Sequence, residues 1–179
     1  MNNIKLFIAA LLLPLTAAAQ TVTSPNGNVS LTFSLTGNGV PTYEMKYKNR
    51  EVVKPSHLGL ELAKDKHASK GLHETSLMDG FTISGTKTST FDETWTPVWG
   101  QYGKIRNNYN ELAVNLTQPS TSRRMTLRFR VYNIGMGLRY EFPQQDSLVY
   151  FVIKDEHTQF AMTGDHRSEE HTSELQSLN

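Results

Sequence analysis

The sequence predicts an all-β fold, an antiparallel β-sandwich, and three observations support that prediction. Apolar and polar residues alternate with a period of two in several segments, most clearly in Val29–Leu35 and Met125–Val131, as half-buried strands require. Turn-forming residues separate these segments, and no segment shows a convincing helical period. The length of 179 residues is typical of one domain with its own hydrophobic core.

The first part of the chain after the N-terminal leader is expected to form antiparallel hairpins. Ser24–Gly27 is a predicted turn, because Pro, Asn and Gly favour turn conformations. Lys48–Arg50 is a second predicted turn. Strands rich in apolar residues are expected around these turns, at Val29–Leu35, Tyr43–Tyr47, Val52–Val53 and Leu58–Leu62. Ala63–Asp79 is polar and lacks either period, so a loop with room for a short helix is expected there.

The second part continues the series of strands. Further strands are expected from Phe81, and then along Tyr109–Leu116, Arg124–Tyr132, Leu138–Phe142, Leu148–Ile153 and Phe160–Met162. Asn133–Gly137 is a predicted glycine-containing turn. It is not a phosphate-binding loop, because it lacks the Lys-Ser or Lys-Thr ending and no helical pattern follows. About ten strands without a convincing helix indicate a sandwich.

One face of the strand Arg124–Tyr132 carries a row of arginines. Arg124, Arg128 and Arg130 alternate with the apolar residues, so they share the face opposite the core. Such a row can bind an anion, or it can pair with carboxylates on a neighbouring strand. We favour pairing, because opposite charges on adjacent strands commonly stabilise a sheet.

The densest mixture of aromatic, amide and charged residues lies in Phe91–Leu116, which holds both tryptophans, Trp95 and Trp99. Pro97 stands between them, and a proline neither donates a ladder hydrogen bond nor fits within a helix. We therefore expect an exposed connection or edge that leads into the next strand. Two interpretations stay open: the indoles cap one end of the core, or they form a docking or ligand surface.

Both ends of the chain are expected to lie outside the folded domain. Residues 1–19 combine Lys5, an apolar run from Leu6 to Leu15 and an Ala17–Ala19 cleavage site, the pattern of a signal peptide. The run is too short for a membrane span, so a periplasmic or secreted protein without a membrane anchor is expected. Arg167–Ser177 resembles the translation of a sequencing-adapter oligonucleotide, so we interpret residues 167–179 as a non-native tail. Residues 20–166 then form the domain.

Composition excludes several kinds of function. Eighteen Lys and Arg against seventeen Asp and Glu give a net charge of +1 without blocks of like charge, so nucleic acid is not an expected partner. The chain has no cysteine, so disulfides and thiolate metal sites are excluded. His57, His67 and His73 lack the spacing of metal ligands, and no metal site is predicted in this chain.

Several motifs in one order give the chain a specific resemblance to the N-terminal domain of glycoside hydrolase family 97, which comprises bacterial α-glucosidases and α-galactosidases. The resemblance spans Thr21–His166 and is carried by these segments: Ser24–Gly27, Pro55–Leu60, Asp92–Gly100, Ile105–Leu112, Arg128–Pro143 and Phe160–His166. Asn108 departs from the family pattern, where histidine is expected.

The resemblance implies a large β-sandwich of the super-sandwich type, present here as an incomplete domain, that precedes a (β/α)₈ barrel. It places the calcium and the catalytic carboxylates on that barrel, so no catalytic residue and no cofactor are expected in this chain. Asp92 and Glu93 are adjacent and point to opposite faces of a strand, so they cannot flank one sugar. Glu111 is expected to pair with Arg106 or a neighbouring arginine.

Two functions follow as hypotheses. In the first, the chain is an accessory domain of an exported calcium-dependent α-glycosidase, bracing the missing barrel and helping to shape a pocket for an α-linked oligosaccharide. In the second, it is a free-standing carbohydrate-binding sandwich. Both use the same candidate carbohydrate-binding or domain-interface residues, namely Trp95, Trp99, Asn107, Asn108, Asn110 and Glu111.

Overall fold

The computed structural model describes residues 19–64 and 76–164, which form eleven β-strands and no helix. The strands are β1 (Gln20–Thr23), β2 (Val29–Leu35), β3 (Pro41–Tyr47), β4 (Arg50–His57), β5 (Leu60–Leu62), β6 (Ser76–Leu77), β7 (Thr82–Trp95), β8 (Ile105–Gln118), β9 (Arg123–Tyr132), β10 (Gly135–Glu141) and β11 (Ile153–Glu156). The predicted tail, residues 1–18 of the predicted signal peptide, and His67 and His73 lie outside the described residues. No helix long and apolar enough to cross a membrane occurs in the described ranges.

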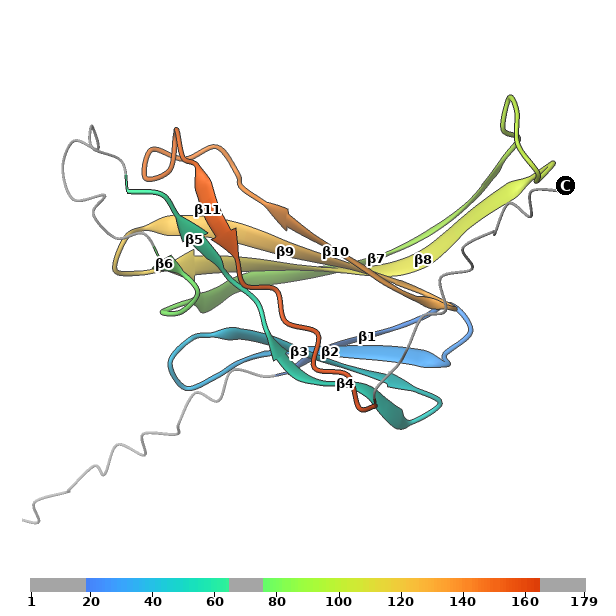
Figure 1. Ribbon diagram of the computed structural model, residues 1–179, viewed down its shortest axis with the longest axis horizontal. Helices are drawn as coiled ribbons and strands as arrows, with labels where there is room; N and C mark the ends of the chain where they lie inside the picture. The colour runs from blue at the N-terminus through green and yellow to red at the C-terminus, as the bar shows by residue number, and fades with distance from the viewer. Residues whose placement is uncertain (1–18, 65–75, 165–179) are drawn as a thin grey trace, which may run out of the picture.

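The strands form three antiparallel sheets, which confirms the predicted all-β sandwich. Two four-stranded sheets, in the orders β1-β2-β3-β4 and β10-β9-β8-β7, form the two layers. A three-stranded sheet of order β11-β5-β6 lies at one end (Figure 1). The β7–β8 hairpin rises as an arm at the opposite end.

The core lies between the two four-stranded sheets and follows from the alternation of side chains. Leu31 and Phe33 of β2 are fully buried, as are Leu127 and Phe129 of β9. Their rings meet across the layers, with the Phe33 and Phe129 centroids 5.9 Å apart. Tyr43 of β3 packs on Phe129 at 6.1 Å, and burial raises the pKa of its phenol to about 12. Because side chains alternate between the two faces of a strand, every second residue of these strands points into the core.

The hairpin between β3 and β4 shows how local sequence fixes register. Lys48 and Asn49 have positive φ angles of 48° and 63°, the conformation that a two-residue type I′ turn requires. Asn readily adopts this conformation. Tyr47 therefore pairs directly with Arg50. The predicted turn at Lys48–Arg50 is confirmed, but it ends at Asn49 and Arg50 already belongs to β4.

Four predictions about elements need correction. Ser76–Leu77 within the predicted loop Ala63–Asp79 is strand β6, because the fully buried Leu77 pairs with Leu60. Gly135–Gly137 belongs to β10 and not to the turn, which is confined to two residues. Residues 148–152 and Phe160 form no strand; only Met162 makes an isolated bridge, to Val53. These segments pack through single apolar side chains such as Leu148, whose spacing looks like strand alternation.

The predicted exposed connection or edge in the central stretch is confirmed, because β7 is an edge strand of its sheet and an exposed connection follows it. β7 extends to Trp95, because its pairing with β8 continues without a bulge from Gly85 to Trp95. Pro97 follows two residues after the strand ends. Proline thus acts as expected on the ladder, and the exposed connection spans residues 96–104.

Candidate functional site

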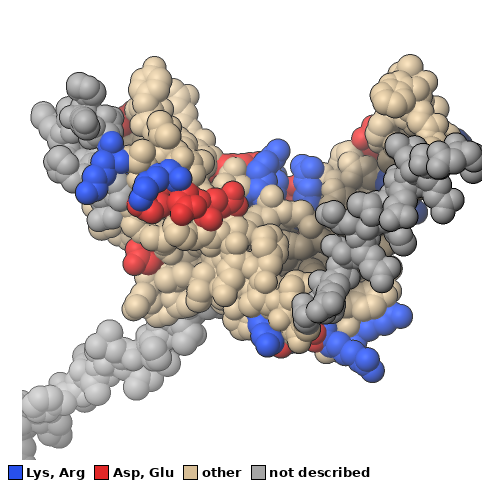
Figure 2. Space-filling view, viewed as in Figure 1, with Lys and Arg blue, Asp and Glu red and all other residues tan. Residues whose placement is uncertain are grey.

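The outer face of the β10-β9-β8-β7 sheet, which points away from the β1–β4 sheet, is the most chemically varied surface of the described chain. Figure 2 shows this surface hollowed between two raised ends of the molecule, with charged side chains on its floor. One raised end is the β7–β8 arm, and the other carries the β11-β5-β6 sheet and the segment before β11 (Figure 1). The open face of a sheet between two raised ends can receive another body.

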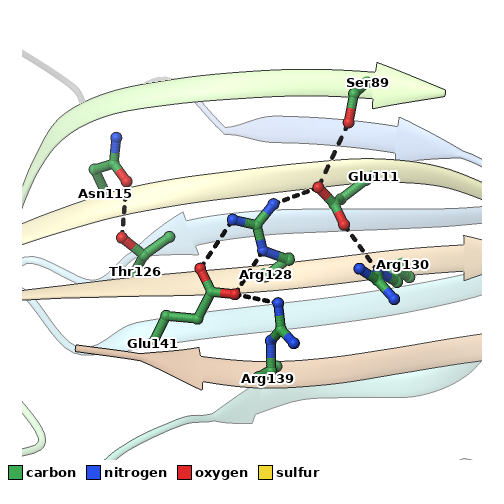
Figure 3. Close-up of polar contacts among 8 residues, drawn as sticks. All are labelled: Ser89, Glu111, Asn115, Thr126, Arg128, Arg130, Arg139 and Glu141. Carbon is green, nitrogen blue, oxygen red and sulfur yellow. Dashed lines mark hydrogen bonds and ion pairs between the residues drawn. The ribbon is translucent and has the colours of Figure 1, made fainter. Parts of the chain in front are cut away.

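An ion-pair network occupies the middle of this outer face, and we call it the arginine–glutamate network (Figure 3). Its members are Glu111 on β8, Arg128 and Arg130 on β9, and Arg139 and Glu141 on β10. Arg128 donates from Nε and Nη2 to both oxygens of Glu141, at 2.9 and 2.8 Å. Arg128 also donates to Glu111, and Arg130 Nε donates to Glu111 Oε2 at 2.9 Å. Arg139 donates to Glu141.

The network keeps both carboxylates ionised. Burial by itself would raise the pKa of Glu111, but hydrogen bonds from Arg130 and Arg128 outweigh it and hold the pKa below its ordinary value. The hydrogen bond from Arg128 lowers the pKa of Glu141, with a further contribution from Arg139. Neither carboxyl is therefore suited to act as a proton donor near neutral pH. The prediction that the arginine row pairs with carboxylates of neighbouring strands is confirmed for Arg128 and Arg130.

Three aromatic rings continue the outer face toward the arm, and we call them the aromatic ladder. Phe91 stacks on Tyr109 with a centroid distance of 5.2 Å, and Tyr109 meets Tyr132 at 5.3 Å. The Arg130 guanidinium lies 4.7 Å from the centroid of the Tyr109 ring, which is a cation–π contact. Tyr109 lies on the outer face and Leu112 on the inner face, since an odd spacing of three along a strand places two residues on opposite faces.

The arm carries the tryptophans on the surface. Trp95, at the end of β7, is 47% exposed, and Trp99 in the connection is 89% exposed. Val98 and Tyr102 in the same connection are also exposed. The alternative in which both indoles cap the core is therefore wrong for this chain. Several large apolar side chains that are exposed on one segment are a feature of docking and ligand-binding surfaces.

The strand pleat divides the predicted site residues between two faces. Trp95, Asn107 and Glu111 lie on the outer face, since they occupy alternate positions of the regular β7–β8 ladder. Asn108 and Asn110 lie on the opposite face, where Asn110 Nδ2 donates to the Thr23 carbonyl at 2.7 Å. The structure thus groups Trp95 with Asn107 and separates them from the other two amides.

Two charged residues of the central stretch pair with each other. Arg106 donates to Asp92 from Nε and Nη2 at 2.8 and 2.6 Å. The expectation that Glu111 pairs with Arg106 is therefore wrong, and its alternative, a neighbouring arginine, is correct. Asp92 and Glu93 point to opposite faces, as expected from their adjacency.

A possible metal cluster, Glu61 on β5 with Asp155 and His157 near β11, does not fit calcium. Its three ligand atoms lie within 4.8 Å of one another. Lys154 Nζ already lies 2.7 Å from Glu61, and calcium takes six to eight oxygen ligands. Among the described residues this cluster offers two carboxylates and one imidazole, so we derive no calcium site from it.

Sequence reasoning missed Arg139, Glu141 and the rings of Phe91 and Tyr132 as parts of this surface. Arg128 and Glu111 are seventeen residues apart, and their contact depends on strand register. The arginine row itself could have indicated these residues, because carboxylates that pair with such a row lie on the strands on either side of it.

Comparison with known proteins gives a consistent family assignment. The sequence model of the family described as Glycosyl-hydrolase 97 N-terminal matches residues 22–174. The chain is 24% identical over 143 residues to a retaining α-galactosidase of Bacteroides thetaiotaomicron, an alignment covering 78% of this chain and 19% of that protein. The chain thus spans about a fifth of that relative's length.

Solved structures agree with this assignment. A glycoside hydrolase family 97 enzyme from Pseudoalteromonas sp. strain K8, in complex with acarbose, superimposes with a TM-score of 0.70 at 29% identity. The match covers 80% of this chain and 20% of that enzyme, and a variant of the enzyme in complex with panose gives the same values. A β-arabinopyranosidase shares the fold at 18% identity and a TM-score of 0.67. The chain belongs to the glycoside hydrolase family 97 N-terminal domain family.

Proposed function

We propose that this chain is the N-terminal accessory β-sandwich domain of an exported, calcium-dependent α-glycosidase, with an α-glucoside or α-galactoside as substrate. The observation that carries the proposal is the match to the N-terminal family over residues 22–174, combined with coverage of only 19–20% of the related enzymes. A shared domain at this identity supports a shared architecture. The names of the relatives support glycosidase activity for the complete protein.

The role of the domain in that enzyme is to brace the catalytic barrel and to help shape the carbohydrate pocket. The exposed side chains of Val98, Trp99 and Tyr102 support this role, because an apolar surface at the end of an arm is stabilised when a second domain covers it. Trp95 and Asn107 add a ring and an amide on the outer face of the same arm. Rings edged by hydrogen-bonding groups serve both domain contacts and sugar pockets.

The catalytic step is assigned to the rest of the enzyme. Glycoside hydrolysis uses two carboxyl groups across the scissile bond, usually one with a raised pKa that acts as the acid. Glu111, Glu141 and Asp92 all have lowered pKa values because arginines hydrogen-bond to them. None of these three carboxyls fits the acid role. Calcium is likewise assigned to the complete enzyme, and export rests on the leader sequence of residues 1–19.

Reading the natural gene beyond the codon for His166 tests the proposal. We expect an open frame long enough for a (β/α)₈ barrel, roughly 250 residues or more. The purified product should hydrolyse an aryl α-glucoside or α-galactoside and lose activity when calcium is chelated. A natural frame that stops shortly after His166 would contradict the proposal.

A free-standing carbohydrate-binding module is the second candidate, favoured by the exposure of Trp95 and Trp99. Exposed indoles stack on sugar rings, so this module would bind oligosaccharides without a barrel. Titration of this chain with panose and with maltotriose, followed by tryptophan fluorescence, separates the two. Saturable binding that Trp95→Ser and Trp99→Ser each weaken favours the module, and no binding favours the accessory domain.

A further inference from the structure

The outer face of β10 has a bare strip that the fold itself does not require. Gly135 and Gly137 are strand residues that face outward on β10. Neither has a positive φ, and a Cβ at either position would meet no atom within 4 Å. Glycine weakens the interior of a strand, and it often marks the close approach of a ligand or of another backbone. The described chain supplies no such neighbour at these positions.

A hollow of about 230 Å³ lies over this strip. It is lined by Arg128, Arg130, Tyr132, Gly137, Leu138 and Arg139. Gly137 pairs with Arg130 and Arg139 pairs with Arg128 across the β9–β10 ladder, so arginine side chains of both strands border the hollow beside the position where Gly137 has no side chain. The hollow therefore combines a bare backbone floor with positively charged walls.

The charges around the hollow do not balance. The arginine–glutamate network holds three guanidinium groups and two carboxylates, a local surplus of one positive charge. Arg130 uses its Nε for Glu111, and Arg139 uses one terminal nitrogen for Glu141. Within the described residues, the other N–H groups of these two side chains can reach a ligand. A single carboxylate matches both the surplus charge and the geometry of guanidinium donors.

We propose that the hollow over Gly137 is a carboxylate-binding site, and that its occupant is an Asp or Glu side chain of the polypeptide that follows this domain in the complete enzyme. The proposal rests on the proposed function, because the related enzymes are about five times as long as the matched region. Glycine at position 137 lets the acidic segment approach the sheet, and Arg130 and Arg139 hold its carboxylate. The contact fixes the orientation of the sandwich on its neighbour.

The site chemistry is testable on this chain alone, with N-acetyl-glutamate amide as the probe and N-acetyl-glutamine amide as its neutral control. The ¹⁵N chain is titrated with each at constant ionic strength, and amide and arginine Nε resonances are followed. We expect millimolar binding of the glutamate probe, with shifts confined to Gly135, Gly137, Arg130 and Arg139. The neutral amide should cause no saturable shift.

Two variants and a matched control localise the effect. Gly137→Val fills the hollow and keeps every charge, and Arg130→Gln removes one donor; each should weaken binding by at least about fivefold. Lys87→Gln removes an exposed positive charge from the same sheet face, on β7, and should change binding less than about twofold. Arg130→Gln also removes a hydrogen bond to Glu111 and can disturb the network. Gly137→Val does not have this effect, because a Cβ at position 137 meets no atom within 4 Å, so its effect on binding can be interpreted independently.

Three results would overturn the proposal. The first is the absence of a localised shift, and the second is equal shifts with the neutral amide. The third is glucuronate binding at least about tenfold tighter than the glutamate probe, which assigns the hollow to a free acidic sugar. The probe titration does not involve the barrel, so these results would not contradict the proposed function. A short natural gene would contradict the proposed function, but the result of the titration would still hold.

Discussion

The two faces of the β10-β9-β8-β7 sheet differ completely although the same strands make both. The inner face of β9 holds Leu127 and Phe129, each fully buried, and the outer face of the same strand holds Arg128 and Arg130 in the arginine–glutamate network. The inner face stabilises the fold through apolar burial. The outer face buries Tyr109, Glu111 and Ala113 but also carries ordered charge, aromatic rings and a bare glycine strip. One strand pattern therefore builds the scaffold and the candidate interface together.

The largest expected effect tests the inner face. Phe129→Ala removes a ring that contacts both Phe33 and Tyr43, so the free energy of unfolding should fall by about 3–5 kcal/mol. Urea denaturation followed by circular dichroism measures the loss. Thr126→Ala, on the outer face of the same strand, is the control and should cost less than about 1 kcal/mol. Equal losses for both variants would contradict the division between the faces.

Glu111→Gln is expected to give the next largest effect. The substitution leaves two guanidinium groups without their shared carboxylate, and the free energy of unfolding should fall by about 1–3 kcal/mol. Glu44→Gln is a suitable control, because Glu44 makes a looser pair with Lys46 at 3.4 Å. A Glu111→Gln protein as stable as the parent in urea would show that the outer network contributes nothing to the fold.

The acid sensitivity of the protein should trace to the outer face. Glu111 and Glu141 have pKa values below the ordinary value of 4.5, so their ionised forms stabilise the folded state. This contribution is complete above about pH 4.5 and is lost as the pH falls through the lowered pKa values. Melting temperatures between pH 7 and pH 3 should fall more for the parent than for Glu111→Gln. Parallel curves for the two proteins would place the acid sensitivity elsewhere.

The smallest expected effect concerns the arm. Trp95→Ser and Trp99→Ser together should change the free energy of unfolding by less than about 1 kcal/mol, because Trp99 is 89% exposed and Trp95 is 47% exposed, outside the core. The double variant should self-associate less, as sedimentation velocity can measure, since an exposed apolar patch favours association. Unfolding of the double variant would instead show that the indoles belong to the core.

Much of this fold could be predicted from the sequence, and the failures have a common cause. Alternation found β2 and β9 because each has one buried and one open face. It wrongly indicated a strand at residues 148–152, where Leu148 is buried in the core and Phe151 packs against it without strand pairing. Apolar side chains that reach the core from an irregular segment can imitate the period of a strand.

The site was less predictable because its contacts depend on register between strands. The arginine row predicted pairing, but nothing in the sequence identified Glu141 as the partner of Arg128. The pleat of β8 separates Asn107 from Asn108 and Asn110, although the three are close in sequence. The glycines of β10 looked like turn residues, and only the structure shows that they lie in a strand without a steric need for glycine.

The most direct test of the account compares this chain with the complete natural protein on aryl α-glucoside and aryl α-galactoside, with calcium present. We expect that the complete protein turns over at least one substrate, and that this chain gives no turnover above a mock-purified blank. Turnover by this chain that persists at constant specific activity through further purification would contradict the central claim that the domain is accessory and not catalytic.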